Sequence, residues 1–100
     1  MSLINLTVKH GQTLEEARRR LEVAVHEITA QFAAFVRRVE WTVDRSRVKL
    51  EGPGAWAEIW VDAQDVHATG DIVAVGRLLG DPLTAGLRQL LEQTFRKPLP

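Results

Sequence analysis

The sequence predicts a single α+β domain over residues 1–100, an antiparallel sheet of about five strands with two helices in the order β-α-β-β-β-β-α. Runs of alternating apolar and polar residues are typical of half-buried strands, and two longer runs with apolar residues three and four apart are typical of amphipathic helices. Only short turns separate the later strands, so these are expected to pair antiparallel. With 45% hydrophobic residues, 100 residues suffice for one thin core but not for two.

The first two expected elements are a strand and a long helix. Residues 3–9 alternate between apolar and polar side chains, as in a strand with one buried face. Thr13 and Glu16 then fit a capping box, in which each side chain accepts a hydrogen bond from the backbone amide of the other residue. The helix behind this box is expected to run for about six turns. Its inward stripe consists of Leu14, Ala17, Leu21, Ala24, Val25, Ile28, Gln31, Phe32 and Phe35.

Four strands and a second helix are expected after the long helix. The strands are predicted at 39–43, 47–51, 55–61 and 66–75, with Gly70 marking a bulge or a bend in the last of them. Asp81 is a good N-cap and Pro82 is favoured at the first helical position, so the second helix is expected to begin there and to stop at Pro98. Gly86 weakens this helix by up to about 1 kcal/mol relative to alanine. Its apolar face consists of Leu83, Leu87, Leu90, Leu91, Thr94 and Phe95.

One strand carries a pattern that a simple core strand does not explain. Successive side chains of a strand point to opposite faces of the sheet. If Ala57, Ile59 and Val61 face the helices, four residues face away from them: Trp56, Glu58, Trp60 and Asp62. The opposite register would bury both tryptophans but would also turn Glu58 into the core, which is costly without a partner. We therefore predict an outward face with two tryptophans, and we expect Trp41, which shares its parity with Val39 and Val43, in the core.

Three interpretations of the outward tryptophans remain open at this point. Arginine side chains of neighbouring strands could lie over the rings as cation–π cover. The rings could instead form a face for self-association, or a surface for a ligand or partner, because a bare pair of tryptophans is a liability for a soluble monomer.

Composition excludes several classes of function. The 13 Lys and Arg residues balance 13 Asp and Glu residues, so no global charge favours nucleic acid or an anionic membrane. The absence of cysteine excludes disulfides, thiolate metal sites and cysteine nucleophiles. No apolar run approaches the ~20 residues of a membrane span, and the first residues do not resemble an export signal. We expect neither nucleic-acid binding nor membrane insertion.

The residues that could carry chemistry are not arranged as a known catalytic or metal motif. His10, His26 and His67 are too scattered for zinc spacing and are interpreted as ordinary surface or edge histidines. Glu58 and Asp62 could share a proton, but a polar strand face explains them more simply. We expect no catalytic residues, no metal and no cofactor, and hence a protein that is not an enzyme.

Several short motifs together resemble the family of polyhydroxyalkanoic acid system proteins. They are Leu-Glu-Glu-Ala-Arg at 14–18, Trp-Thr-Val-Asp at 41–44, Ile-Trp-Val at 59–61 and Gly-Arg-Leu-Leu at 76–79. The resemblance spans nearly the whole chain. It implies a bacterial, cytoplasmic protein encoded near genes for polyester granules, without an established enzymatic activity and without catalytic residues to transfer.

Together these observations predict a non-enzymatic module that forms a homodimer or binds a protein partner, with the polyhydroxyalkanoate granule as a candidate location. The expected contact face is the one formed by Trp56, Glu58, Trp60 and Asp62. An alternative is a carrier that encloses a small apolar ligand between the long helix and a curved sheet, because small residues such as Ala17 and Ala24 lie in the helix stripe.

Overall fold

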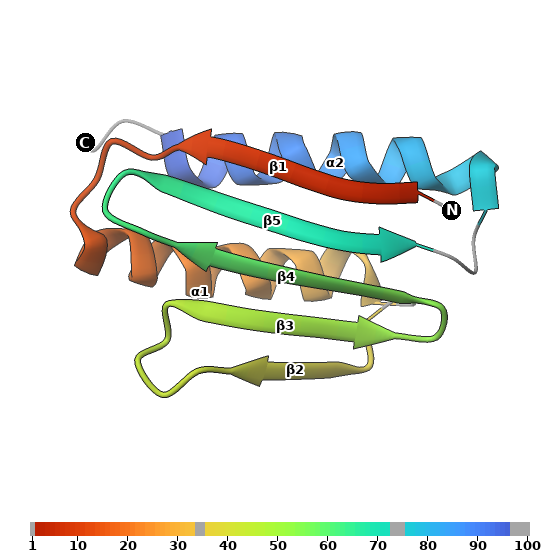
Figure 1. The fold of residues 1–100 in the computed structure, drawn as a ribbon, viewed down its shortest axis with the longest axis horizontal. Coiled ribbons are helices and arrows are strands. Elements are labelled where there is room, and N and C mark those ends of the chain that lie inside the picture. The colour runs from red at the N-terminus through yellow and green to blue at the C-terminus, as the bar shows by residue number, and fades with distance from the viewer. Residues whose placement is uncertain (1, 34–35, 73–75, 97–100) are drawn as a thin grey trace.

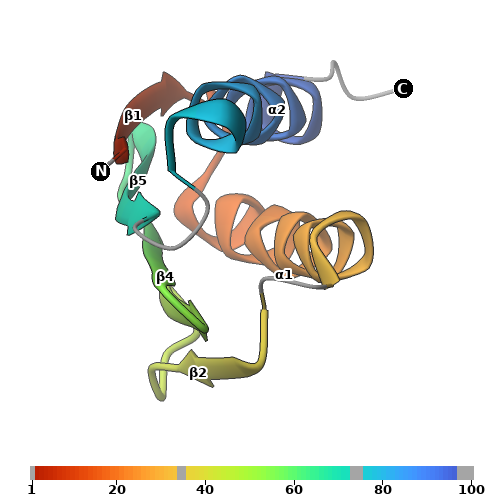
Figure 2. The same ribbon diagram turned by 90° about the vertical axis from the view of Figure 1, so that its right-hand side faces the viewer.

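The computed structural model describes residues 2–33, 36–72 and 76–96, and it confirms the predicted α+β fold and element order. One five-stranded antiparallel sheet is arranged in the order β1-β5-β4-β3-β2 (Figure 1). Both helices pack on the same side of this sheet (Figure 2). The elements are β1 Ser2–Lys9, α1 Leu14–Gln31, β2 Arg38–Trp41, β3 Arg47–Gly52, β4 Ala55–Val61, β5 Asp65–Ile72 and α2 Gly76–Arg96.

The strand order follows from one long crossing and three tight turns. Strands β2 to β5 form a meander in which each strand pairs with the next. Strand β1 pairs with β5, at the far edge from β2. Helix α1 therefore carries the chain across the back of the sheet from one edge to the other (Figure 1). Strand β4 therefore lies in the middle of the sheet. The helices cover only one of its two faces.

The core lies between the sheet and the two helices. Helix α1 contributes the buried residues Ala17, Leu21, Ala24, Val25 and Ile28, as the predicted stripe requires. The strands contribute Leu6, Val8, Val48, Leu50, Ile59, Val61, Val66 and Ala68, and helix α2 contributes Leu87, Leu90, Leu91 and Phe95.

Helix α1 is shorter than predicted at its C-terminal end, and the first and last residues of the predicted inward stripe that lie in it are not buried. Its last residue is Gln31, with Phe32 as C-cap, because the chain from Arg37 onwards is already hydrogen-bonded to β3 through Glu51. Phe35 lies outside the described residues. Leu14 and Gln31, at the two ends of the predicted stripe, are exposed.

Half of the predicted capping box forms at the start of this helix. The Thr13 hydroxyl accepts a hydrogen bond from the Glu16 amide at 3.1 Å. The Glu16 carboxylate does not reach back to Thr13, because it binds Arg19 at 3.3 Å and Arg20 at 3.4 Å on the next turn. The Arg20 guanidinium also donates to the Thr94 carbonyl at 2.8 Å, which links α1 to the last turn of α2.

The predicted start of the second helix is wrong. Helix α2 begins at Gly76, so Asp81 and Pro82 lie inside it and do not cap it. Arginine and leucine, which occupy positions 77–79, are good helix formers and extend the helix ahead of the Asp-Pro pair. The expected stop at Pro98 and the expected end of β5 at residues 73–75 lie outside the described residues.

The β2–β3 turn begins earlier than the alternation of Val39, Trp41 and Val43 predicted. The Asp44 carboxylate accepts from the Thr42 hydroxyl at 2.8 Å and from the Ser46 amide at 3.1 Å, so the strand ends at Trp41. Val43 is therefore fully exposed at the tip of the turn, not part of the core. Val39, on the free edge strand, is exposed as well. Trp41 is half-buried and packs against the core.

Gly70 marks a close approach and not a bulge. The pairing of β5 with both neighbours runs through Gly70 without interruption, opposite Ala57 on one side and Ile4 on the other. A Cβ atom at this position would lie 2.3 Å from the Trp56 carbonyl oxygen. Only glycine lets β4 and β5 approach so closely here.

Candidate functional site

The outer face of the sheet carries the four residues that the sequence singled out. Ile59 and Val61 are buried toward the helices, so Trp56, Glu58 and Trp60 of β4 point to the other side, and Asp62 follows directly after the strand, in the turn to β5. This confirms the predicted register of β4. Figure 1 looks directly onto this face, with both helices behind the sheet.

Trp60 is covered by its neighbours on both adjacent strands. Its direct partners across the sheet are Arg47 on β3 and His67 on β5. The Arg47 guanidinium carbon lies 4.7 Å from the centroid of the Trp60 ring. The His67 ring stacks on Trp60 with centroids 5.1 Å apart and an interplanar angle of 19°. Arg47 also forms an ion pair with Glu58, so the cation over the ring is held by a carboxylate.

Trp56 lies on the same strand and face but in a different environment. Its direct partners are Glu51 on β3 and Asp71 on β5, both acidic. The Trp56 residue is 42% exposed. Among the residues that the structure describes, no cationic side chain lies over its ring, and Oδ1 of Asp71 is buried without a hydrogen-bond partner. The two tryptophans of β4 are thus not equivalent.

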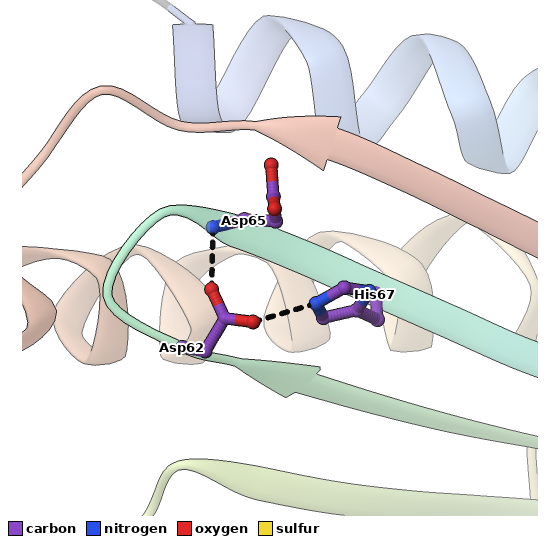
Figure 3. A group of neighbouring side chains, drawn as sticks. All are labelled: Asp62, Asp65 and His67. Atoms are coloured by element: carbon purple, nitrogen blue, oxygen red, sulfur yellow. Dashed lines mark hydrogen bonds and ion pairs between the residues drawn. The ribbon is translucent and has the colours of Figure 1, made fainter.

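Asp62 organises the turn between β4 and β5. Its Oδ1 accepts hydrogen bonds from the backbone amides of Asp65 at 2.6 Å and Gln64 at 2.9 Å, and its Oδ2 lies 2.8 Å from Nε2 of His67 (Figure 3). The amide of Asp65 first, then the His67 side chain and the amide of Gln64, lower the pKa of Asp62 from 3.8 to about 2. The sequence pattern predicts Asp62 only as part of the outward face. An Asp two or three residues before the amides of a turn is nevertheless a known turn signal.

Asp62, Asp65 and His67 form the group of described side chains that could approach a metal ion together. Their ligand atoms lie within 4.8 Å of one another. In Figure 3, however, the Asp65 side chain points away from the other two, and Asp62 and His67 bind each other directly. His67 also contacts the Thr7 hydroxyl through Nδ1 at 3.3 Å. The hydrogen bonds of Asp62 and His67 explain why these side chains lie together: they stabilise the β4–β5 turn.

His10 is buried, which corrects its interpretation as a surface histidine. It is 3% exposed, its Nε2 lies 2.8 Å from the carbonyl oxygen of Asp62, and its Nδ1 accepts from the Gln12 amide at 2.9 Å. A neutral imidazole offers one donor and one acceptor, which these two bonds use. His10 thus ties the end of β1 to the turn after β4. His26 is exposed on α1, as predicted.

The carboxylates weighed as a proton-sharing pair do not form one. Glu58 is paired with Arg47, whereas Asp62 is bound by the turn and by His67. Each acid is thus held by its own partner.

The fold and the outer face define a class of protein, namely a two-layer α+β domain whose five-stranded antiparallel sheet is covered by helices on one side only. A family model described as "Putative polyhydroxyalkanoic acid system protein" matches residues 4–95. The match covers most of the chain, so the protein belongs to this granule-region family, as its sequence motifs indicated. No match was found among curated proteins and none among solved structures. Within the described residues, neither helix combines the length and apolar character needed to cross a membrane.

Proposed function

We propose that the protein is a cytoplasmic, non-enzymatic binding module of the bacterial polyhydroxyalkanoate system that acts through the outer face of its sheet. The observation that carries the proposal is the exposure of Trp56, 42% of which faces solvent on the side of the sheet that no described helix covers. Membership of a granule-region family supports the polyester granule as the place where this face is used.

The exposed part of Trp56 is large enough to anchor a contact but not to hold a stable complex alone. It corresponds to about 100 Å² of mainly apolar surface, whose burial is worth about 2.5 kcal/mol. A standard stable interface needs about 800 Å² per partner. Neighbouring residues of the face must therefore contribute to any specific contact.

The outer face around Trp56 is charged, which bears on the kind of partner. Lys49 pairs with Glu51 at 3.5 Å, and Arg38 pairs with Glu40 at 2.5 Å on the edge strand. A bare polyester surface offers no formal charges to replace the water around such groups, and burying them there would be costly. We therefore favour a protein at the granule surface as the partner, with a second copy of this chain as the competing form of the same proposal.

Co-sedimentation with isolated granules that retain their protein coat tests the proposal. The wild-type protein should sediment with coated granules, and Trp56→Glu should reduce the bound fraction at least ten-fold. Val23→Glu is the matched control, because Val23 is 55% exposed on α1, away from the outer face. Binding of Trp56→Glu at the wild-type level would contradict the role of this face.

Sedimentation of the protein alone separates the two forms of the proposal. If a second copy is the partner, the wild type should form dimers at high micromolar concentration and Trp56→Glu should remain monomeric. A wild type that stays monomeric would eliminate self-association and leave the partner at the granule.

A further inference from the structure

The protein has three tryptophans, and two of them follow the same rule. The Arg45 guanidinium carbon lies 4.5 Å from the centroid of the Trp41 ring, and the Arg45 side chain is held by Glu22 at 2.9 Å. Arg47 lies over Trp60 and is held by Glu58. In both cases an arginine covers the ring while a carboxylate fixes its guanidinium.

The third tryptophan has a carboxylate beside it, but no arginine of the described residues lies over its ring. Asp71 lies directly across from Trp56 on β5, and among the described residues its buried Oδ1 has no hydrogen-bond donor. Glu51 lies directly across on the other side, on β3. The nearest cations along this face are already engaged, since Lys49 pairs with Glu51 and Arg38 pairs with Glu40.

We propose that the Trp56 ring, together with Asp71 and Glu51, receives an arginine side chain of a partner protein. This inference rests on the proposed function, because it names the chemistry of the partner that the outer face binds. A cation within about 6 Å of an aromatic centroid is attracted by the negative face of the ring, and the two carboxylates strengthen that attraction. The Asp71 carboxylate lies directly across from Trp56 on β5, so its negative charge favours a cation at the ring.

Arginine fits this arrangement better than lysine. A planar guanidinium can stack on the indole and still donate hydrogen bonds from its edge to a carboxylate, whereas an ammonium acts as a point charge. The chain itself uses arginine at both of its other tryptophans, although it also contains lysine. The partner segment should therefore carry an exposed arginine, and replacing it with lysine should weaken the contact.

Titration of the full-length protein with short capped peptides tests this inference, with the indole N–H signals of the three tryptophans as the readout. The probes are a tetra-arginine peptide, its tetra-lysine counterpart, and a tetra-citrulline peptide, which has nearly the same shape as arginine but no charge. We expect saturable movement of the Trp56 signal with arginine, at least three-fold weaker binding of lysine, and no binding of citrulline. The Trp41 and Trp60 signals should stay in place.

Three variants make the test specific. Trp56→Leu and Asp71→Asn should each weaken binding of the arginine peptide at least five-fold. Because Trp56→Leu has no indole signal at this position, its binding is measured from a backbone amide signal of β4. Glu40→Gln is the matched control, because Glu40 lies on the same face but two strands away from Trp56 and is paired with Arg38. It should change affinity less than two-fold.

The possible results test the arginine receptor and the proposed function of the outer face separately. Equal binding of arginine and citrulline peptides, or full affinity of Asp71→Asn, would overturn the arginine receptor. If the arginine peptide fails to bind while Trp56→Glu still abolishes granule binding, the outer face is the binding face and its occupant is not an arginine. If granule binding is also insensitive to Trp56→Glu, the proposed function fails as well.

Discussion

Two aspartates of this protein, Asp44 and Asp62, act on the turns that join its strands. Asp44 and Asp62 each close a hairpin turn by accepting hydrogen bonds from backbone amides within three residues. The Ser46 amide, followed by the Thr42 and Ser46 hydroxyls, lowers the pKa of Asp44, and the Asp65 amide leads the causes that lower the pKa of Asp62. Both acids thus favour the folded state only while they are ionised.

This linkage gives a prediction for the stability of the protein at low pH. The pKa of Asp62 is about 2 in the folded protein, against 3.8 ordinarily, so its contribution is fully present above about pH 4 and is lost as the pH falls toward 2. Asp62→Asn keeps an oxygen that can accept hydrogen bonds but has no charge to lose. We expect the urea midpoint of the wild type to fall more steeply between pH 4 and pH 2 than that of Asp62→Asn. Parallel curves for the two proteins would contradict this assignment of Asp62.

Secondary-structure elements were predictable to the extent that local pattern determines them. Alternation located all five strands, and the parity of β4 correctly turned Trp56 and Trp60 outward, because one face of a central strand must meet the core. Element ends were less predictable. The end of β2 depends on the Asp44 turn, and the end of α1 depends on where the chain pairs with β3, which is a contact between distant residues.

The local sequence pattern could not predict which side chains surround the two tryptophans of the candidate site. Which side chains flank each tryptophan depends on the strand order and on the register between strands, neither of which the sequence fixes by itself. Arg47 and His67 lie beside Trp60, and Glu51 and Asp71 beside Trp56, only because of the register of β3, β4 and β5. The same holds for His10, whose burial depends on the turn between β4 and β5.

Two glycines in different elements provide a matched test of this packing. In β5, Gly70→Ala would place Cβ 2.3 Å from the Trp56 carbonyl oxygen and 2.9 Å from the Ala57 Cα, and backbone atoms cannot easily move away. In α2, Gly86→Ala would place Cβ 3.5 Å from Cζ of Phe32, which is an ordinary contact. We expect Gly70→Ala to destabilise the protein by about 2–3 kcal/mol. Gly86→Ala should stabilise it by up to about 1 kcal/mol through helix propensity.

Urea unfolding monitored by circular dichroism measures both changes from the midpoints, provided that the slopes stay the same. A neutral Gly70→Ala would mean that β4 and β5 can separate at this point without cost. A destabilising Gly86→Ala would mean that the Phe32 ring cannot yield to the added methyl group.

At the scale of the whole molecule, charges are balanced both in number and in position. The formal net charge is zero, and the outer face alternates acids and bases in exposed pairs such as Lys49–Glu51 and Arg38–Glu40. Pairs of this kind contribute little to stability, because water screens them and their side chains lose freedom when they pair. Folding therefore depends on the apolar layer between sheet and helices, and the charges on the outer face are left for the proposed partner contact.

Salt separates these two roles. Raising NaCl from about 50 mM to about 1 M shortens the screening length from more than 10 Å to about 3 Å. Because there is no net charge to screen and the exposed pairs are weak, we expect the free energy of unfolding in urea to change by less than about 1 kcal/mol. Binding of the arginine peptide at Trp56 should instead weaken at least five-fold, since it depends on the charges of Asp71 and Glu51. A marked loss of stability at high salt would show that the outer ion pairs hold the fold together, and the face could then not exchange its partners without disturbing the sheet beneath it.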